Sequence, residues 1–530
     1  MKQKIMLCAL MLCALVLASC GSEAEYSKFI PKESSIVGRI DVAQIAEKGE
    51  FGDNAQVADI LNKAIKTSGL SAKGKVVADK IIADPALTGL DLRKPVFFYK
   101  SDDSQGEHFG VIATVLKKSD LNDFFNYLST EFGGEKTKEY KDVNYIADGD
   151  VLAAFNDTWL VIKDIQNGSA QSAIDALLAR EDIKPEQTIE SEACYQRMLE
   201  GNGLAQLVVR GSMFAGAMSQ FGMGNGTQNV KDAASDFDYI FDLKSDKGEL
   251  SLDFETFAAS EEGRNRLSQS KKFYDEIQGE YADYIDQEAL FTFVGNLHGK
   301  EVVKFLEESG MGEMGLNQYS DYLAAINGDV VFTMNALKAN LNGLDSRMFL
   351  QVSSPQPYLG LRSALGNVPG LNEFSPNEFS LSLGQLAPIP DLISEMKLAD
   401  ENAPMPTGNI LFNFGVNNNR NVYAAFSLNS NAFDKVKNPI SKDTFHGRSA
   451  YIRFNSTNAI EIVRLIAKNN GDDNSYDFKI GMNVMEQINY AELYITTDQK
   501  AKLCIKMRNE DKNGLATLVG VLANIASLVG

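Results

Sequence analysis

The sequence predicts an α+β fold made of two similar halves, each a mostly antiparallel sheet with helices packed on one face. Three observations lead to this fold class. Apolar extended runs are followed several times by a short polar loop and then by apolar residues at helical spacing. Paired runs in which apolar and polar residues alternate predict hairpins with one polar face. Short sequence matches also recur at nearly constant separation along the chain.

The chain begins with a short leader that is basic and then apolar. Lys2 and Lys4 precede the apolar residues 5–16, a stretch that suits a signal peptide and is too short to span a bilayer as a helix. The leader ends in Leu17, Ala18, Ser19 and Cys20. This ending resembles the lipobox of bacterial lipoproteins, in which the peptidase cuts before the cysteine and the thiol carries the lipid. The alternative is an ordinary secretory signal that contains a cysteine by chance.

The lipobox divides the N-terminal region into a signal peptide over residues 1–19 and a polar tether over residues 20–28. It predicts an outer-membrane protein that is anchored only by lipid at Cys20, because two or more acyl chains anchor a protein stably. Glu23 and Glu25 resemble the acidic surface-export signals of Bacteroides-type lipoproteins. They favour the cell surface over the periplasmic face, although both sides of the membrane stay open.

Strand-to-helix units are predicted in both halves of the chain. In the first half, residues 109–116 lead to a helix with Ser119 as its N-cap, and residues 159–162 lead to a helix after Ser169. In the second half, residues 423–428 lead to a helix after Ser430, and residues 451–454 lead to one after Ser456. Alternating residues predict hairpins over 237–254 and over 490–507.

Two matched pairs of segments predict an internal duplication. Residues 29–33 match residues 284–288 at an offset of 255, and residues 262–267 match residues 510–515 at an offset of 248. The competing interpretation is that two unrelated α+β halves happen to contain similar hairpins. Duplication would place the halves at residues 29–283 and 284–530.

Composition and charge exclude some classes of partner. The chain has 530 residues, of which 44% are hydrophobic, so that it can bury substantial cores. Its net charge is −20, and loss of Lys2 and Lys4 with the leader takes it to −22. Such a surface repels phosphate backbones, so no nucleic-acid partner is expected. It also disfavours direct adhesion to anionic lipid.

Cysteine usage excludes a disulfide-rich scaffold and a zinc site. Cys194 and Cys504 are the cysteines that remain after the leader and Cys20. Two thiols are expected, and a single disulfide between them stays open because two distant cysteines carry no spacing information.

Catalytic signatures are absent from the sequence. Neither a Gly-x-Ser-x-Gly elbow nor a His-Glu-x-x-His helix occurs. His108, His298 and His446 are isolated, so each is expected on the surface, and neither a metal nor another cofactor is expected. The glycine-rich residues 222–226 lack the Lys-Ser/Thr of a phosphate loop and predict a plain loop.

Three further segments have structural interpretations. Residues 509–514 start like a calcium loop, but Gly520 stands where the bidentate Glu is needed, so a polar turn that caps the last helix is expected. Residues 472–475 predict a solvated acidic loop. Trp159, the single tryptophan, lies in an apolar run and is expected in the core.

Three segments carry a family resemblance: the lipobox, residues 29–42 with their Phe-Ile-Pro-Lys-Glu opening, and residues 89–96 (Gly-Leu-Asp-Leu-Arg-Lys-Pro-Val). Together they resemble a family of uncharacterised lipoproteins from Bacteroides-type gut bacteria, labelled as a domain of unknown function. The resemblance implies a location in the cell envelope and assigns neither an activity nor site residues.

The function expected from the sequence is that of a non-catalytic envelope lipoprotein that binds or scaffolds an envelope protein or a glycan. One alternative is an anchored extracellular hydrolase that acts through carboxylates, although no pair of the 71 acidic residues is singled out by spacing. Another alternative is a polysaccharide-capture protein, which predicts an exposed row of tyrosines on one face.

Overall fold

The computed structural model describes residues 26–51, 71–103, 106–165, 168–213, 236–258, 260–308, 319–335, 345–360, 368, 370–382, 411–418, 420–427 and 431–529. The leader, Cys20 and residues 222–226, for which the sequence predicts a loop, lie outside these residues. The fold divides into two compact units: unit 1 comprises residues 1–263 and 509–530, and unit 2 comprises residues 264–508. The boundary expected between residues 283 and 284 therefore falls within unit 2, and the last helix belongs to unit 1.

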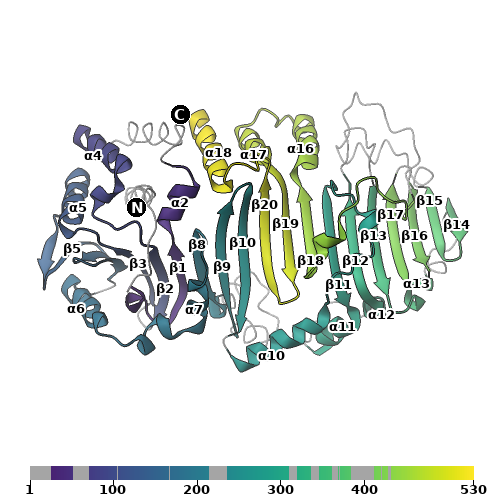
Figure 1. Ribbon diagram of the computed structural model, residues 1–530, viewed down its shortest axis with the longest axis horizontal. Coiled ribbons are helices and arrows are strands. Elements are labelled where there is room, and N and C mark those ends of the chain that lie inside the picture. Colours follow the sequence, from purple (N-terminus) through teal and green to yellow (C-terminus); the bar gives the residue numbers. More distant parts are fainter. Residues whose placement is uncertain are drawn as a thin grey trace. The chain divides into compact units, whose positions relative to one another are not determined.

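Unit 1 contains ten strands among its described residues (Figure 1). Its strands are β1 (Ser34–Ile40), β2 (Val96–Asp103), β3 (Gly106–Thr114), β4 (Lys138–Tyr140), β5 (Val143–Asp148), β6 (Val151–Phe155), β7 (Trp159–Asp164), β8 (Ala205–Arg210), β9 (Phe237–Asp246) and β10 (Glu249–Ala258). Its helices are α2 (Val42–Lys48), α4 (Ala72–Ala83), α5 (Lys118–Phe132), α6 (Ala170–Glu181), α7 (Ala193–Leu199) and α18 (Gly514–Val529). Short 3-10 helices are η1 (Ser27–Phe29), η2 (Pro85–Thr88), η3 (Pro185–Gln187) and η4 (Ile189–Ser191). The chain passes from unit 1 to unit 2 within α10 (Glu261–Ser270).

Unit 2 also contains ten strands among its described residues (Figure 1). Its strands are β11 (Phe291–His298), β12 (Ile326–Met334), β13 (Asp345–Val352), β14 (Leu371–Ser375), β15 (Glu378–Ser382), β16 (Leu411–Asn417), β17 (Asn421–Ser427), β18 (Arg448–Asn455), β19 (Ile488–Thr496) and β20 (Lys500–Met507). Its helices are α11 (Gly299–Glu308), α12 (Ser320–Ala325), α13 (Gln356–Leu359), α16 (Ser456–Asn470) and α17 (Tyr476–Met485). Short 3-10 helices are η6 (Lys271–Phe273), η7 (Ala282–Tyr284) and η11 (Lys442–Phe445).

The two units have the same strand order. Hydrogen-bonded neighbours in unit 1 run β4-β5-β6-β7-β3-β2-β1-β8-β9-β10, with every pair antiparallel. In unit 2 they run β14-β15-β16-β17-β13-β12-β11-β18-β19-β20, again antiparallel throughout. The fold is thus a mixture of helices with large, open antiparallel sheet, as the sequence predicts.

The entry into the sheet is also alike in the two units. A 3-10 helix precedes the first strand in each case, η1 before β1 and η7 before β11. An isolated antiparallel bridge follows each of these helices, Pro31 with Thr188 in unit 1 and Asp286 with Pro439 in unit 2. Thr188 and Pro439 each lie between the seventh and eighth strands of their own unit.

Helices cover both faces of the unit 1 sheet, so the prediction of helices on one face is wrong for this unit. Successive strand residues point to opposite faces. Trp159 and Val161 of β7 pack in a core cluster with Ile174 of α6, whereas Leu160 packs in a second cluster with Leu121 of α5. The reason is that β7 is apolar at consecutive positions, while only the hairpin strands alternate with polar residues.

The helix predicted after Ser430 is absent, and the described residues 431–440 form turns and loop. Buried Arg347 donates hydrogen bonds to the carbonyl oxygens of Ala432 (3.2 Å) and Asp434 (2.5 Å), which hold this segment against β13. The Phe433 ring lies 4.9 Å from that of Tyr423. The Phe433 side chain therefore packs in an aromatic core cluster and does not lie on the face of a helix.

Other local predictions are confirmed with small shifts. The two predicted hairpins are β9–β10 and β19–β20. Ser169 caps α6 by accepting a hydrogen bond from the Ser172 amide at 3.1 Å. Helix α5 begins at Lys118, so its N-cap position is Lys117, two residues before the expected Ser119, and α16 is capped by Asn455. Within the part of the chain that the structure describes, no helix combines the length and apolarity that a membrane-spanning helix needs.

Candidate functional site

The three histidines are divided between the units: His108 is in unit 1, whereas His298 and His446 are in unit 2 and pair with the consecutive residues Asp275 and Glu276. Each pairs with a carboxylate: His108 with Asp164 at 2.8 Å, His298 with Asp275 at 2.8 Å, and His446 with Glu276 at 3.0 Å. Among the described residues, no three or more His, Cys, Asp and Glu side chains gather in a way that could hold a metal ion.

Cys194 and Cys504 are both buried thiols. Cys194 lies in α7 and Cys504 in β20. Burial raises the pKa of the Cys194 thiol to about 12, so this side chain stays protonated at neutral pH. A protonated, buried thiol is a poor nucleophile.

Trp159 and two of the tyrosines considered for glycan binding contact other side chains, whereas Tyr319 and Tyr322 are exposed. Trp159 is buried, with its ring 5.1 Å from that of Phe29. The guanidinium groups of Arg453 and Arg448 on β18 lie 3.9 Å from the ring centres of Tyr490 and Tyr494 on β19, respectively. An arginine guanidinium group therefore lies over one face of each of these two tyrosine rings.

The segment that resembles the start of a calcium loop caps the last helix, as expected. Asn513 Oδ1 accepts hydrogen bonds from the amide of Leu515 (3.0 Å) and from Ser245 Oγ (2.5 Å). The side-chain oxygen of Asn513 therefore caps an amide in the first turn of α18 and links this helix to β9.

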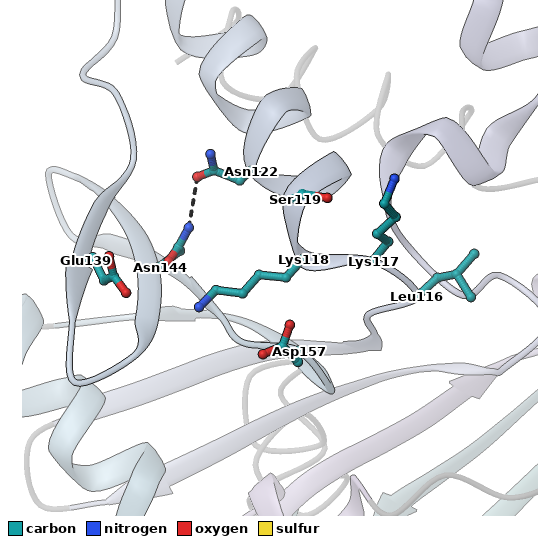
Figure 2. Close-up of a pocket in the computed structure, with 8 residues that line it drawn as sticks. All are labelled: Leu116, Lys117, Lys118, Ser119, Asn122, Glu139, Asn144 and Asp157. Carbon is teal, nitrogen blue, oxygen red and sulfur yellow. Dashed lines mark hydrogen bonds between the residues drawn. The ribbon is translucent and has the colours of Figure 1, made fainter.

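A polar pocket of about 700 Å³ lies in unit 1 at the start of α5 (Figure 2). It is lined by Leu116, Lys117, Lys118, Ser119, Asn122, Glu139, Asn144 and Asp157. Asn144 Nδ2 donates to Asn122 Oδ1 at 2.9 Å, and Lys118 Nζ donates to the carbonyl oxygen of Asp142 at 2.7 Å. Figure 2 shows Lys118 extending between Glu139 and Asp157, so the pocket presents mixed charges rather than a bare carboxylate pair.

An apolar pocket of about 220 Å³ lies in unit 2, on one face of the sheet. Its lining comprises Tyr274, Phe293, Gly295, Asn296, Leu297, Val330, Ser449, Ala450 and Ile495. Strand register explains its position. Val330, Gly295, Ala450 and Ile495 stand opposite one another in a row across β12, β11, β18 and β19. Because glycine and alanine occupy the middle of this row, the sheet is hollow there.

The walls of this hollow come from larger neighbours. Phe293 and Leu297 stand two residues to either side of Gly295 on β11 and share its face. The Cβ that an alanine would place at Gly295 has its nearest neighbour, an atom of the Phe293 ring, at 3.4 Å. The space above the glycine is therefore open enough to accept an additional group.

The pocket belongs to a larger apolar face of the unit 2 sheet, opposite its main core cluster. Beside it, a second row of paired residues crosses six strands: Met348, Phe332, Phe293, Ile452, Leu493 and Leu503. Met348, Phe332, Leu493, Ile495 and Phe454 of this face are between 36% and 41% exposed. We call these five residues, with the pocket, the apolar face.

The helices of unit 2 cover part of the same side of the sheet. Val416 and Val422 pack with Ala325 at the end of α12 and with Tyr358 of α13. A group of exposed apolar side chains that are contiguous on one sheet face is the kind of surface at which ligands or partners bind.

The apolar pocket could not be found from the sequence alone, because its residues meet only through cross-strand register. One weak signal is present: Gly295 interrupts the apolar run of β11, and an isolated glycine in a strand marks a bulge or a close approach. The exposed face has a similar signal in the phenylalanines of β11, which alternate with residues of the buried face.

Comparisons with known proteins provide a family but not an activity. No curated protein matches the chain. Two crystal forms of TP0453, forms III and I, are each 10% identical, with a TM-score of 0.25; they align with 48% of this chain and with 89% and 88% of that chain. A family model described as a domain of unknown function, DUF4836, matches residues 26–355. The chain therefore belongs to the DUF4836 family.

Proposed function

We propose that this protein is a non-catalytic binding protein of the cell envelope, anchored by lipid at Cys20, that takes up an apolar ligand on the apolar face of unit 2. The observation that carries the binding role is this face, with its exposed side chains and its hollow at Gly295. Burial of such apolar area on binding is favourable in proportion to the area removed from water.

The anchoring part of the proposal rests on the leader. Residues 1–19 have the charge, length and ending of a lipoprotein signal, and Cys20 is the residue that would carry the lipid. The mature net charge of −22, obtained by subtracting Lys2 and Lys4 from the total of −20, opposes direct adhesion to anionic lipid. We propose an outer-membrane location, with the cell-surface side favoured by Glu23 and Glu25.

We also propose that the two units arose by duplication of one ancestral unit. The shared strand order supports this origin, because ten strands can be ordered in a great many ways. The 3-10 helix and the single bridge before the first strand of each unit add to that support. The duplication matters for function because matching residues of the two units can then be compared, and the differences indicate what is particular to unit 2.

The binding role is tested with bis-ANS, a dye that fluoresces on exposed apolar surface. The double variant Phe332→Glu with Leu493→Glu places two charges on the apolar face and should lower bound-dye fluorescence at least twofold. The matched control is Leu87→Glu with Val151→Glu in unit 1, where both residues are 47% exposed. An equal loss in both variants, or none in the first, would contradict the proposed binding surface.

A further inference from the structure

The equivalent position in unit 1 shows what fills a hollow of this kind. Gly38 is the counterpart of Gly295: each glycine lies in the first strand of its unit and directly follows a core valine, Val37 or Val294, that is 1% exposed. Gly38 pairs with Phe98 on β2 and with Leu207 on β8, as Gly295 pairs with Val330 and Ala450.

An aromatic ring occupies the hollow in unit 1. The Phe98 ring sits where a Cβ on Gly38 would lie, so the glycine is covered by that ring. The row continues through Leu207 to Phe241 on β9. Unit 1 therefore has Phe, Leu and Phe around its glycine, whereas unit 2 has Val330, Ala450 and Ile495 around Gly295.

These three smaller residues leave the unit 2 hollow empty and apolar. Its volume of about 220 Å³ exceeds the roughly 150 Å³ of an apolar cavity that stays dry and binds benzene. A phenyl ring is therefore small enough for the space, and unit 1 already places one over the matching glycine.

We propose that the pocket over Gly295 binds the aromatic ring of a small ligand. In unit 1, the side chain of Phe98 supplies the corresponding ring. The inference rests on the proposed function, since it names the ligand chemistry of the same apolar face. Val330, Ala450 and Ile495 act as specificity residues, because each is smaller than its counterpart in unit 1 and together they leave room for the ring. Phe293, Leu297 and Tyr274 form the walls around it.

The test is a methyl NMR titration of the full chain carrying Cys20→Ala, so that no attached lipid competes, with toluene as the aromatic probe. Toluene should shift the methyl signals of Val330, Leu297 and Ile495 in a saturable manner. An equal concentration of n-hexane should bind at least tenfold more weakly. Equal binding of the two probes would overturn the aromatic assignment.

Two reciprocal variants make the test specific. Val330→Phe rebuilds the unit 1 arrangement and should weaken toluene binding at least tenfold. Phe98→Val opens the hollow over Gly38 and should create a second toluene site that shifts the Leu207 methyl signals; Trp159 fluorescence checks that unit 1 remains folded. An unchanged titration in Val330→Phe overturns the proposal, even where Phe98→Val fails to fold.

The outcome also separates this inference from the proposed function. Suppose that Phe332→Glu with Leu493→Glu lowers bis-ANS binding but Val330→Phe leaves toluene binding unchanged. The binding role of the apolar face is then supported, and the aromatic site is contradicted. If both measurements fail, the binding role and the aromatic site fall together.

Discussion

Gly38 and Gly295 occupy matching strand positions, yet they have opposite effects on packing. At Gly38 the missing side chain lets the Phe98 ring lie against the backbone, so the site is full. At Gly295 a Cβ methyl group would have its nearest neighbouring atom at 3.4 Å, which is ordinary van der Waals contact. The consequence of adding one methyl group should therefore differ between the two positions.

We expect Gly38→Ala to destabilise unit 1 by about 1–3 kcal/mol, because the new methyl group displaces a packed ring. Gly295→Ala should be neutral or should stabilise unit 2 by up to about 1 kcal/mol, since alanine restricts the unfolded chain. Thermal unfolding followed by Trp159 fluorescence reports on unit 1, and hydrogen exchange of β11 amides reports on unit 2. Equal destabilisation at both positions would contradict the difference in packing.

At the scale of elements, the last helix belongs with strands that precede it by about 260 residues. Helix α18, drawn in yellow in Figure 1, packs against β9, β10 and α2. Its start is held by Asn513, which accepts a hydrogen bond from Ser245, and Ala516 and Val521 are buried. Unit 1 is therefore completed by the C-terminal end of the chain.

We expect Asn513→Ala to cost unit 1 about 1 kcal/mol through loss of the cap, which lowers the Trp159 unfolding midpoint by about 2–4 °C. Ser475→Ala is the matched control. Ser475 caps α17 of unit 2 by accepting from the Phe478 amide at 3.2 Å. Its loss should leave the Trp159 midpoint in place. The reverse pattern would contradict the assignment of α18 to unit 1.

Elements set by local pattern were predictable, and elements set by distant contacts were not. The β9–β10 hairpin follows from alternating residues with Gly248 in the turn, and α6 from Ser169 and its apolar spacing. The helix expected after Ser430 does not form because Arg347 and Phe349, both distant in sequence, hold that segment through a hydrogen bond and a ring contact. Periodicity describes one strand at a time, so it could not show which residues meet across the sheet.

At the scale of the whole molecule, we propose different roles for the leader and the folded body, namely membrane anchoring and ligand binding. We propose that lipid at Cys20 holds the protein at the membrane and that the net negative charge disfavours direct adhesion of the body to anionic lipid. The apolar face of unit 2 is then available to a ligand. Under this proposal unit 2 would bind the ligand, whereas the matching position in unit 1 is already covered by Phe98.

Anchorage at Cys20 is the claim on which the envelope role depends, and fatty-acid labelling combined with membrane fractionation tests it directly. The unsubstituted chain should incorporate labelled fatty acid and sediment with the membranes. Cys20→Ala should lose the label and leave the membrane fraction, whereas Cys8→Ala with Cys13→Ala, both within the leader, should keep both properties. Continued labelling or membrane retention of Cys20→Ala would contradict the account.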